Sequence, residues 1–441
     1  MRFQKTLQEK VEITRERVSK IVKEKGDVEI GRIAIADIFS GNRGLDLLIS
    51  DTSYVDTEQG LLIHNIPIRE LLQLLPKAPD SEYPLAGGLY YFLMIGEIPA
   101  HEQAMEIEDE WKKRGEIPLY VDEMLHAMPP EAHPMTMFSQ AVLAMQTYSE
   151  FEKGFNNGLQ KPDYWIATLE DALNLTARAP VIAAIIYNIK YRNREHITPN
   201  PELDWSANFA YMIGRAWDIH YQELMRLFFV LHSDQGIGNV SGHTAILVNS
   251  ALSDVFYACS AAMNGLAGPL HGRANQDCLK WLLDIKDHFS GCPSAEELDA
   301  YIWDTLQRGK LVPGYGHPVL RNTDPRFLAQ LEFGKKYMPD DDLFKLALLV
   351  YEVAPKVLAR HGKAKNPYPN IDAISGTLQY FCGVHHFDFY PVLFGVGRIL
   401  GITTNLVWAR AMLMPLERPQ SITFDMIEEK AGLETVSSSA I

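Results

Sequence analysis

Strand-like sequence in this chain of 441 residues is confined mainly to one short region near the N-terminus, Leu47 to Ile68. Within it, Asp51, Thr57 and Gly60 interrupt short β-branched runs, a pattern typical of strands joined by turns. Elsewhere, apolar residues recur at helical spacing or form long Ala-, Leu- and Ile-rich runs with little alternation. We therefore predict a mainly α-helical protein with a minor β element near the N-terminus.

The helical pattern begins at the N-terminus and continues through the middle of the chain. Apolar residues at helical spacing precede Gly26 and predict a first helix that ends there: Leu7, Val11, Val18 and Val22. The stretches 168–189 and 209–231 are rich in Ala, Leu, Ile, Met and Phe, and we expect them to be core helices of a large bundle. Pro180 within the first of these stretches predicts a kink or a break.

The longest apolar region runs from Val392 to Met414 and contains Arg398, Asn405 and Arg410. A membrane-spanning helix rarely carries two arginines, because a charged side chain in the hydrocarbon core is costly. The region therefore predicts a buried helix pair, and we expect no membrane partner.

The charge balance limits the classes of ligand. There are 41 Lys and Arg against 56 Asp and Glu, a formal net charge of −15. Neither nucleic acid nor an anionic membrane is attracted to an acidic surface, so we expect neither as a partner. An anionic small-molecule substrate would need a local group of arginines that overrides the global charge.

The cysteines exclude two classes of small scaffold. Their wide spacing, with no CxxC pair, fits neither a disulfide framework nor a zinc site: Cys259, Cys278, Cys292 and Cys382. We therefore expect no metal and a reducing compartment. The first residues lack the apolar core of a signal peptide and carry too many glutamates for a transit peptide. The expected location is the bacterial cytoplasm, with a mature form in the mitochondrial matrix as the alternative.

Changes in pattern along the chain suggest its domain organisation. At roughly 150 residues per domain, the length predicts two or three domains. A hydrophobic stretch gives way to a charged, amphipathic run near residues 272–290, and small apolar residues return after an aromatic cluster at 380–390. We expect a large helical domain made of residues 1–272 and 385–441, with a smaller helical domain, 273–384, inserted between them.

Two glycine-containing motifs carry candidate catalytic histidines. His271 lies in the segment NGLAGPLHGRANQ, where glycines allow close backbone approach to a ligand; a histidine at a helix cap is the alternative. His317 follows the loop VPGYG and, with Pro318, is expected to begin a helix. Backbone N–H groups in such a loop suit a phosphate, a carboxylate or a planar ring, although an ordinary turn has the same pattern. Arg321 and Arg326 follow at spacings that place both near one end of the expected helix.

A carboxylate and two further arginines complete the set of candidate site residues. Asp372 follows the stiff segment NPYPNI, which suits a general base, although aspartate is also a common helix N-cap. Arg398 lies in an apolar helix and Arg418 in the segment PLERP. A buried guanidinium needs an acidic partner or a ligand, and it matches carboxylates bidentately. A structural salt bridge and a di- or tricarboxylate ligand both satisfy that need.

One reaction uses two histidines, a carboxylate and several arginines together. It is carbon–carbon bond formation between an enolisable thioester and a 2-oxo dicarboxylate. A carboxylate removes the carbon-bound proton, neutral donors hold the enol oxygen and polarise the ketone, and arginines bind the carboxylates.

The sequence resembles the citrate synthase family in its longer, mitochondrial-like form. The resemblance runs from SGNRG near Arg43 to PLERP, and it rests on five motifs in family order: HSD…GNVSGHT, AAMNGLAGPLHGRANQ, VPGYGHPVLRNTDPRF, GKAKNPYPNIDAISG and LFGVGRILG. It implies a citrate synthase-like fold, a nearly all-α homodimer with a large domain and a small mobile domain. The reaction it implies belongs to the tricarboxylic acid cycle: acetyl-CoA condenses with oxaloacetate, and citryl-CoA is hydrolysed to citrate and CoA.

The resemblance also implies roles for individual residues. Asp372 would deprotonate the acetyl-CoA methyl group, His271 would stabilise the enol, and His317 would bind and protonate the oxaloacetate carbonyl. The implied substrate-binding residues are Gln235, Arg326, Arg398 and Arg418, the last supplied by the partner subunit. The implied CoA-binding residues are Arg43, Val312, Pro313, Gly314, Tyr315, Gly316, Arg321 and Lys363. The implied co-substrate is acetyl-CoA, with no permanently bound cofactor.

The chain departs from the family pattern at three positions. Gln235 replaces the usual oxaloacetate-binding histidine and cannot become a cation, and Ile237 replaces a glycine in the same loop. Neutral hydrogen bonds contribute about 0.5–1.5 kcal/mol against about 1.5–3 kcal/mol for charged ones, so the expected loss in oxaloacetate handling is roughly tenfold. Arg273 follows the catalytic histidine, where it either helps to keep His271 neutral or faces solvent.

Three functions fit this sequence. The first is a citrate synthase that tolerates the altered loop. The second is a 2-methylcitrate or alkylcitrate synthase that uses propionyl-CoA or a longer acyl-CoA. The third is a non-catalytic protein that binds CoA and a dicarboxylate, which the intact acid–base residues disfavour.

Overall fold

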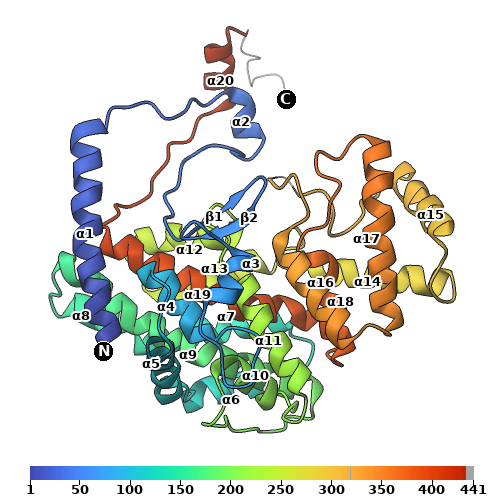
Figure 1. Cartoon of the computed structure of the whole chain (residues 1–441). Helices are drawn as coiled ribbons and strands as arrows, with labels where there is room; N and C mark the ends of the chain where they lie inside the picture. Colours follow the sequence, from blue (N-terminus) through green and yellow to red (C-terminus); the bar gives the residue numbers. More distant parts are fainter. Residues whose placement is uncertain (318, 434–441) are drawn as a thin grey trace.

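Helices form most of the protein, as predicted, in a computed structural model that describes residues 1–317 and 319–433. In chain order, the first described helices are α1 (Arg2–Lys25), α2 (Ile35–Phe39), α3 (Ile68–Leu74), α4 (Ala86–Ile95), α5 (His101–Arg114), α6 (Leu119–Ala127) and α7 (Pro134–Ala144). They continue with η1 (Met145–Tyr148), α8 (Glu150–Asn156), η2 (Lys161–Asp163), α9 (Tyr164–Tyr191), α10 (Trp205–Met212), α11 (Ile219–His232), α12 (Val240–Ser250) and α13 (Val255–Leu266). Figure 1 shows these helices, apart from α2, packed into one large body.

The minor β element lies within the predicted region. It is an antiparallel sheet of β1 (Ser53–Asp56), β2 (Gly60–Ile63) and β3 (Ile66–Pro67), in the order β1-β2-β3. Asp56 pairs with Gly60 across the first turn, where Gly60 has a φ of 78°. A Cβ at Gly60 would lie 2.4 Å from Pro325, so only glycine lets the hairpin contact the segment that carries Arg326.

The core is centred on α19 (Tyr390–Ala411), which packs against α9, α11, α12 and α13. The prediction of a helix pair at 392–414 was wrong, because the region forms this single helix. The stretches 161–191 and 387–411 are long and apolar enough to cross a membrane. However, 72% and 89% of their most apolar windows are buried inside the protein, as expected for core helices.

Two further predictions about core helices need correction. Pro180 does not break α9: it removes the N–H that would pair with the Thr176 carbonyl, and Trp205 Nε1 donates to that carbonyl instead at 2.9 Å. The stretch 209–231 is two helices, α10 and α11. The turn between them contains Gly214 at a φ of 82°, packed against the guanidinium group of Arg192.

A second group of helices lies together on one side of the body (Figure 1). It comprises α14 (Ala274–His288), α15 (Ala295–Gln307), α16 (Pro325–Tyr337), α17 (Asp342–His361) and α18 (Asp372–Phe381). Within the group, α14 packs on α17 and α18, and α15 packs on α17. The chain then returns to the body through η3 (Phe387–Phe389) and α19. The domain boundaries at 272/273 and 384/385 stay predictions, and residues 434–441 lie outside the described residues.

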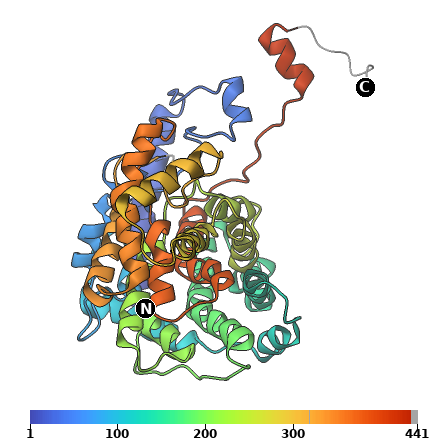
Figure 2. The same cartoon turned by 90° about the vertical axis from the view of Figure 1, so that its right-hand side faces the viewer.

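Two short helices project from the body as an arm. α2 and α20 (Phe424–Ala431) lie side by side away from the other helices in Figure 1, and Figure 2 also shows α20 projecting from the body. Phe39 and Phe424 stack with ring centroids 6.2 Å apart, yet both remain largely exposed. The predicted first helix is present, with Leu7 and Val11 buried, but Val18 and Val22 on its second half are exposed.

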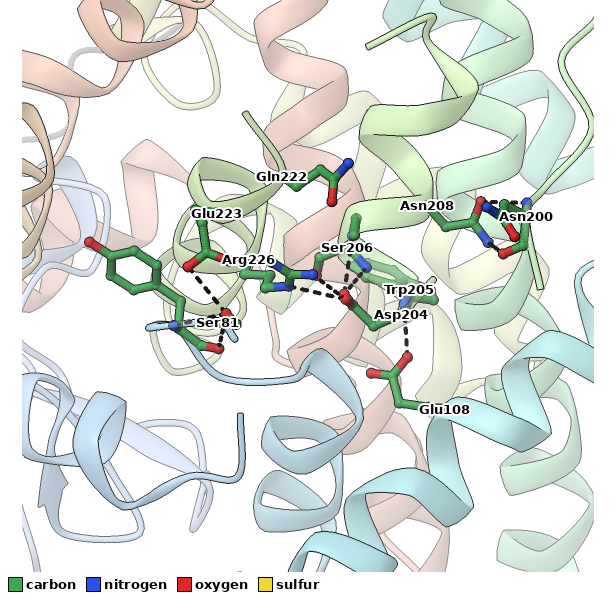
Figure 3. A network of polar contacts seen from close by, with 12 residues as sticks. Ser81, Glu108, Asn200, Asp204, Trp205, Ser206, Asn208, Gln222, Glu223 and Arg226 are labelled. Atoms are coloured by element: carbon green, nitrogen blue, oxygen red, sulfur yellow. Dashed lines mark hydrogen bonds and ion pairs between the residues drawn. The ribbon is translucent and has the colours of Figure 1, made fainter. Parts of the chain in front are cut away.

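A buried network of charges joins α5, α10 and α11 (Figure 3). Arg226 Nε and Nη2 donate to Asp204 Oδ2 at 3.0 and 2.6 Å, and its Nη1 pairs with Glu223. Glu108 accepts hydrogen bonds from the backbone N–H groups of Trp205 and Gly87, both at 2.8 Å. Burial and the nearby charge of Asp204 raise the pKa of Glu108 to about 7. Two carboxylates, those of Asp204 and Glu223, therefore depend on one guanidinium group, and Glu108 joins the network through the backbone of Trp205.

Arg226→Met should lower the free energy of unfolding by about 3–5 kcal/mol, because it leaves buried carboxylates unpaired. An ionised carboxylate is costlier to bury without a partner than a protonated one, so the cost of the unpaired Asp204 and Glu223 side chains grows as pH rises and they ionise. The variant should therefore lose more stability at pH 8 than at pH 5.5, as measured by urea denaturation. Arg308→Met is the control, since Arg308 pairs with Asp304 at the surface. Equal urea midpoints for the two variants would contradict the prediction.

Candidate active site

Asp372 is the first residue of α18, and the loop before it is held in place by backbone hydrogen bonds. Asn370 N–H donates to the Gly314 carbonyl at 2.8 Å, and Asp324 N–H donates to the Pro369 carbonyl at 3.1 Å. The helix N-cap is Ile371, so Asp372 is not the cap. Burial raises the pKa of Asp372 to about 6, even though Arg326 and Arg398 act to lower it. The carboxyl can therefore both accept and release a proton near neutral pH.

His271 lies in the turn that leads into α14, and its tautomer is fixed by the structure. Ser241 N–H donates to His271 Nε2 at 3.3 Å, and Ser241 Oγ lies 2.9 Å from the same nitrogen. A backbone N–H can only donate, so Nε2 is the acceptor and the neutral ring carries its proton on Nδ1. Burial and the charge of Arg398 lower the pKa of His271 to about 4. His271 is thus a neutral donor, and the N-cap of α14 is Arg273.

His317 has the opposite tautomer. Its Nδ1 accepts from the backbone N–H groups of Val319 and Leu320 at 3.2 and 3.1 Å, which leaves the proton of the neutral ring on Nε2. Burial and the charge of Arg326 lower the pKa of His317 to about 4. The prediction that a helix begins at His317 was wrong: α16 begins at Pro325, and the segment between ends in the Asp-Pro pair that starts this helix. Pro318 lies outside the described residues.

Arg326 is buried in the first turn of α16 and is held on two sides. Its Nε and Nη2 donate to Asp324, with Nη2 2.8 Å from Oδ2, and its Nη1 donates to Gln235 Oε1 at 3.0 Å. Burial alone would raise the pKa of Asp324, but Arg326 holds it below its usual value. Asp324 also caps α16, so one carboxylate orients both the helix and its arginine.

Arg398 is buried in α19 with unused binding capacity. Its Nε donates to the His232 carbonyl at 3.2 Å, and its guanidinium group lies 4.8 Å from the Phe394 ring centroid. Among the described residues no ion pair includes Arg398, and Nη1 has no hydrogen-bond partner. Burial, assisted by the charge of Arg326, lowers the pKa of Arg398 to about 10. These observations favour an anionic ligand over a structural salt bridge.

The loop that carries Gln235 is fastened to the β-sheet and to α19. Asp234 is buried and accepts from Ser53 Oγ at 2.7 Å and from Thr52 Oγ1 at 3.1 Å. Gly401 N–H donates to the Ser233 carbonyl at 3.2 Å, and a Cβ at Gly401 would lie 2.6 Å from Asp234. The fixed loop points Gln235 towards Arg326, and Ile237 is buried beside it.

Sequence reasoning missed several residues of this site. Ser241 sets the tautomer of His271, and Asp324 orients Arg326; an Asp-Pro pair at a helix start could have indicated the latter. His232 donates from Nδ1 to the Phe228 carbonyl at 2.8 Å, while its Nε2 is buried and has no hydrogen-bond partner among the residues that the structure describes. Burial lowers the pKa of His232 to about 3, so its ring is neutral. His232 is the first residue of the motif HSD…GNVSGHT, and that motif was the signal that could have indicated it.

Arg273 is not the cation that acts on His271. The pKa of His271 responds to Arg398, whereas the charge of Arg273 acts on the pKa of His133, which is lowered mainly by burial. Arg273 is partly buried, and its Nε lies 3.0 Å from the side-chain amide of Gln276. The alternative that Arg273 faces solvent stays a prediction, since its side chain is only partly buried.

The predicted CoA-binding residues form one loop and three separate basic side chains. The loop is Val312, Pro313, Gly314, Tyr315 and Gly316, and Tyr315 forms an isolated β-bridge with Pro369, shortly before Asp372. Gly314 has a φ of 78°, and a Cβ there would lie 2.8 Å from Ala373. The structure thus joins this loop to the start of α18.

The basic side chains predicted for CoA are exposed: Arg43, Arg321 and Lys363. Arg321 lies near His317 and donates to the Val319 carbonyl at 2.8 Å. Arg43 lies between α2 and β1, and Lys363 follows the end of α17. Arg418 is also exposed, in the segment after α19. Among the described residues of this single chain, no hydrogen bond or ion pair joins Arg43 or Arg418 to the other predicted site residues.

Comparisons with known proteins agree closely with one another. The model of a family described as "Citrate synthase, C-terminal domain" matches residues 41–420. The mitochondrial citrate synthase 4 of Arabidopsis thaliana is 45% identical over 422 residues, covering 96% of this chain and 89% of the relative. The mitochondrial 2-methylcitrate synthase of Yarrowia lipolytica is 43% identical over 434 residues, which cover 98% of this chain and 92% of that relative. The crystal structure of citrate synthase from Pyrobaculum aerophilum has a TM-score of 0.76 at 24% identity, covering 90% and 95%.

Proposed function

Because this chain belongs to the citrate synthase family, we propose that Asp372, His271 and His317 carry out the family's reaction. The chain is an acyltransferase that condenses acetyl-CoA with oxaloacetate and then hydrolyses the thioester to give citrate and CoA. The substrates supply all the reacting groups, and the described residues include no group of three or more side chains that could hold a metal ion. The chemistry therefore falls to the side chains of the site.

The roles of the three residues follow from their protonation states. Asp372, with a pKa of about 6, is ionised at neutral pH and removes a proton from the acetyl methyl group. His271 donates from Nδ1 to the developing enol oxygen, because Ser241 occupies its Nε2. His317 donates from Nε2 to the ketone oxygen of oxaloacetate, and it transfers the proton as the new carbon–carbon bond forms. Arg326 and Arg398 bind the substrate carboxylates.

The observation that carries this assignment is the pair of opposite tautomers. Backbone N–H groups fix His271 and His317 as neutral donors, one through Nδ1 and the other through Nε2. The experiment measures thiol release from acetyl-, propionyl- and hexanoyl-CoA, each with oxaloacetate. Fastest release from acetyl-CoA is expected, and no release from any of the three would overturn the proposal.

A 2-methylcitrate synthase is the second candidate. It is favoured by the relative from Yarrowia lipolytica, which is 43% identical and covers 98% of this chain. A higher kcat/KM for propionyl-CoA than for acetyl-CoA would establish it in place of the first.

Gln235→His should lower the apparent KM for oxaloacetate by up to about tenfold, because a histidine can bind a carboxylate as a cation. In this chain the Gln235 oxygen accepts from Arg326, so only its amide N–H groups are free for substrate. Initial rates at varied oxaloacetate and saturating acetyl-CoA measure the change. Gln235→Leu is the control, which should raise the same KM. If Gln235→His leaves the KM unchanged or raises it, the loop has adapted to glutamine.

We also propose that two copies of the chain form a homodimer, in which Arg418 of each copy serves the other copy's site. The projecting arm of α2 and α20 supports this, since its exposed aromatic rings have little else to cover them. Val240 and Leu247 on α12 are exposed as well, as are Val18 and Val22 on α1. Exposed apolar side chains spread over several elements are typical of a protein–protein interface. Light scattering of the purified protein should give twice the chain mass, and a monomer would contradict the proposal.

The proposed location is the bacterial cytoplasm, where the reaction would serve the tricarboxylic acid cycle. The similar proteins from Arabidopsis thaliana and Yarrowia lipolytica are both mitochondrial, which supports the mitochondrial matrix as the alternative.

A further inference from the structure

The chain segment after α19 is attached to α12 at one residue, Glu417. Its backbone N–H donates to Ser250 Oγ at 3.1 Å, and its Oε1 accepts from His243 Nε2 at 2.8 Å. Within the described part of the chain, residues 415–422 make no hydrogen bonds except these two. His243 and Ser250 are seven residues apart on α12, about two turns, so they lie on one face of the helix. Glu417 is therefore fixed in both position and direction.

The attachment of Glu417 determines how the next residue is presented. Pro419 restricts Arg418 to extended backbone, in which its side chain cannot lie on the same side as that of Glu417. Glu417 faces α12 of its own chain, and the Arg418 side chain is exposed. Arg418 is thus directed away from the helix that holds its neighbour.

α12 also contributes to the site of its own chain. Ser241, near the start of the helix, contacts His271. Successive helical residues are rotated by about 100°, so the side chains of residues 241 and 243 point in nearly opposite directions. One helix therefore contacts a catalytic histidine on one face and the segment carrying Arg418 on the other.

We propose that His243 is a positioning residue that, through Glu417, presents Arg418 to the active site of the partner subunit. This inference rests on the proposed function, in which Arg418 binds substrate across the dimer. The Nε2–H of His243 donates to the Glu417 carboxylate, and this bond selects the direction of the segment at the residue before Arg418. Without it, Arg418 remains tethered but samples many directions, so the substrate carboxylate loses an oriented partner.

The first test is steady-state kinetics of the full-length dimer. His243→Ala should raise the KM for oxaloacetate about tenfold, the size expected for a charged hydrogen bond, and leave the KM for acetyl-CoA unchanged. Glu417→Ala should raise the KM for oxaloacetate by the same factor, and it replaces His243→Ala as the test variant if His243→Ala does not fold. Glu417→Gln should restore most of the affinity, because an amide oxygen still accepts from Nε2. An unchanged KM for oxaloacetate in both alanine variants would overturn the proposal.

Hybrid dimers then show on which subunit His243 acts. The reference hybrid joins an Asp372→Ala chain to an Arg418→Ala chain, each with its own affinity tag. If Arg418 acts across the dimer, one of the two sites is complete and the hybrid has about half the activity of the wild-type dimer. An inactive reference hybrid would overturn the proposed arrangement itself, independently of His243.

The test hybrid joins an Asp372→Ala chain to a His243→Ala chain. Its one working site has Asp372 from the His243→Ala chain and Arg418 from a chain whose His243 is intact. The expected result is a wild-type KM for oxaloacetate at about half the wild-type maximal rate. If His243 instead acts on its own site through Ser241, the same hybrid would show the raised KM of the His243→Ala homodimer, which would refute the proposal.

Discussion

Asp372→Ala is expected to reduce turnover by roughly 10²–10⁴-fold, the usual contribution of a general base, while oxaloacetate still binds. Asp324 cannot replace the lost carboxylate, because both of its oxygens are bound to Arg326 and its pKa is held below the usual value. The arginines proposed to bind oxaloacetate, Arg326 and Arg398, keep their own hydrogen bonds, which do not involve Asp372. Turnover by thiol release and oxaloacetate binding by calorimetry measure the two effects separately.

The pH profile of the wild-type enzyme gives a second measurement of the base. Asp372 acts only when ionised, so the rate should fall as pH decreases through about 6, the pKa that burial gives its carboxyl group. Asp342→Ala is the matched control, since Asp342 is the first residue of α17 as Asp372 is of α18, but it is exposed. Retained turnover in Asp372→Ala, or an equal loss in Asp342→Ala, would contradict the assignment.

The fold was predictable where local pattern decides the structure, and less so where distant contacts do. The confinement of strands to 47–68 needed only the spacing of β-branched residues. The passage of α9 through Pro180 depends on Trp205, which supplies the hydrogen bond that proline removes. Similarly, α19 is one helix because protein buries its whole length. Apolar runs alone do not show how many helices a core region contains.

In the candidate site, too, some features were predictable from local sequence and others depend on distant contacts. Glycines and prolines around His271, His317 and Asp372 mark unusual backbone, so sequence could select these residues. Their protonation states come from contacts made only in three dimensions, such as the Ser241 N–H on His271. The altered loop was visible in the sequence as Gln235, but its partner Arg326 is 91 residues away. Motifs thus locate the reacting groups, and tertiary contacts determine what each can do.

Arg398→Met is expected to weaken oxaloacetate binding by about 10²-fold or more while making the protein more stable. Arg398 is buried, and none of the ion pairs among the described residues includes it, so the cost of desolvating its charge exceeds the stabilisation by the nearby charges of Asp234 and Asp372. Burial lowers its pKa from 12.5 to about 10, which corresponds to roughly 3 kcal/mol of destabilisation at neutral pH. A cation with a lowered pKa costs stability at any pH below that pKa, and methionine removes this cost.

The stabilised but inactive variant would show that Arg398 is retained for its ligand. Melting temperature should rise by several degrees without substrate, and oxaloacetate should raise it in the wild type but not in the variant. Arg410→Met is the matched control: Arg410 lies on the same helix, its pKa is also lowered by burial to about 10, and it likewise donates to one backbone carbonyl, that of Ser253. Its guanidinium group, however, lies 4.6 Å from the Phe151 ring centroid instead of beside Phe394. Replacing Arg410 should leave the affinity for oxaloacetate unchanged. A lower melting temperature for Arg398→Met would instead mean that the bond to the His232 carbonyl and the contact with Phe394 hold the core together.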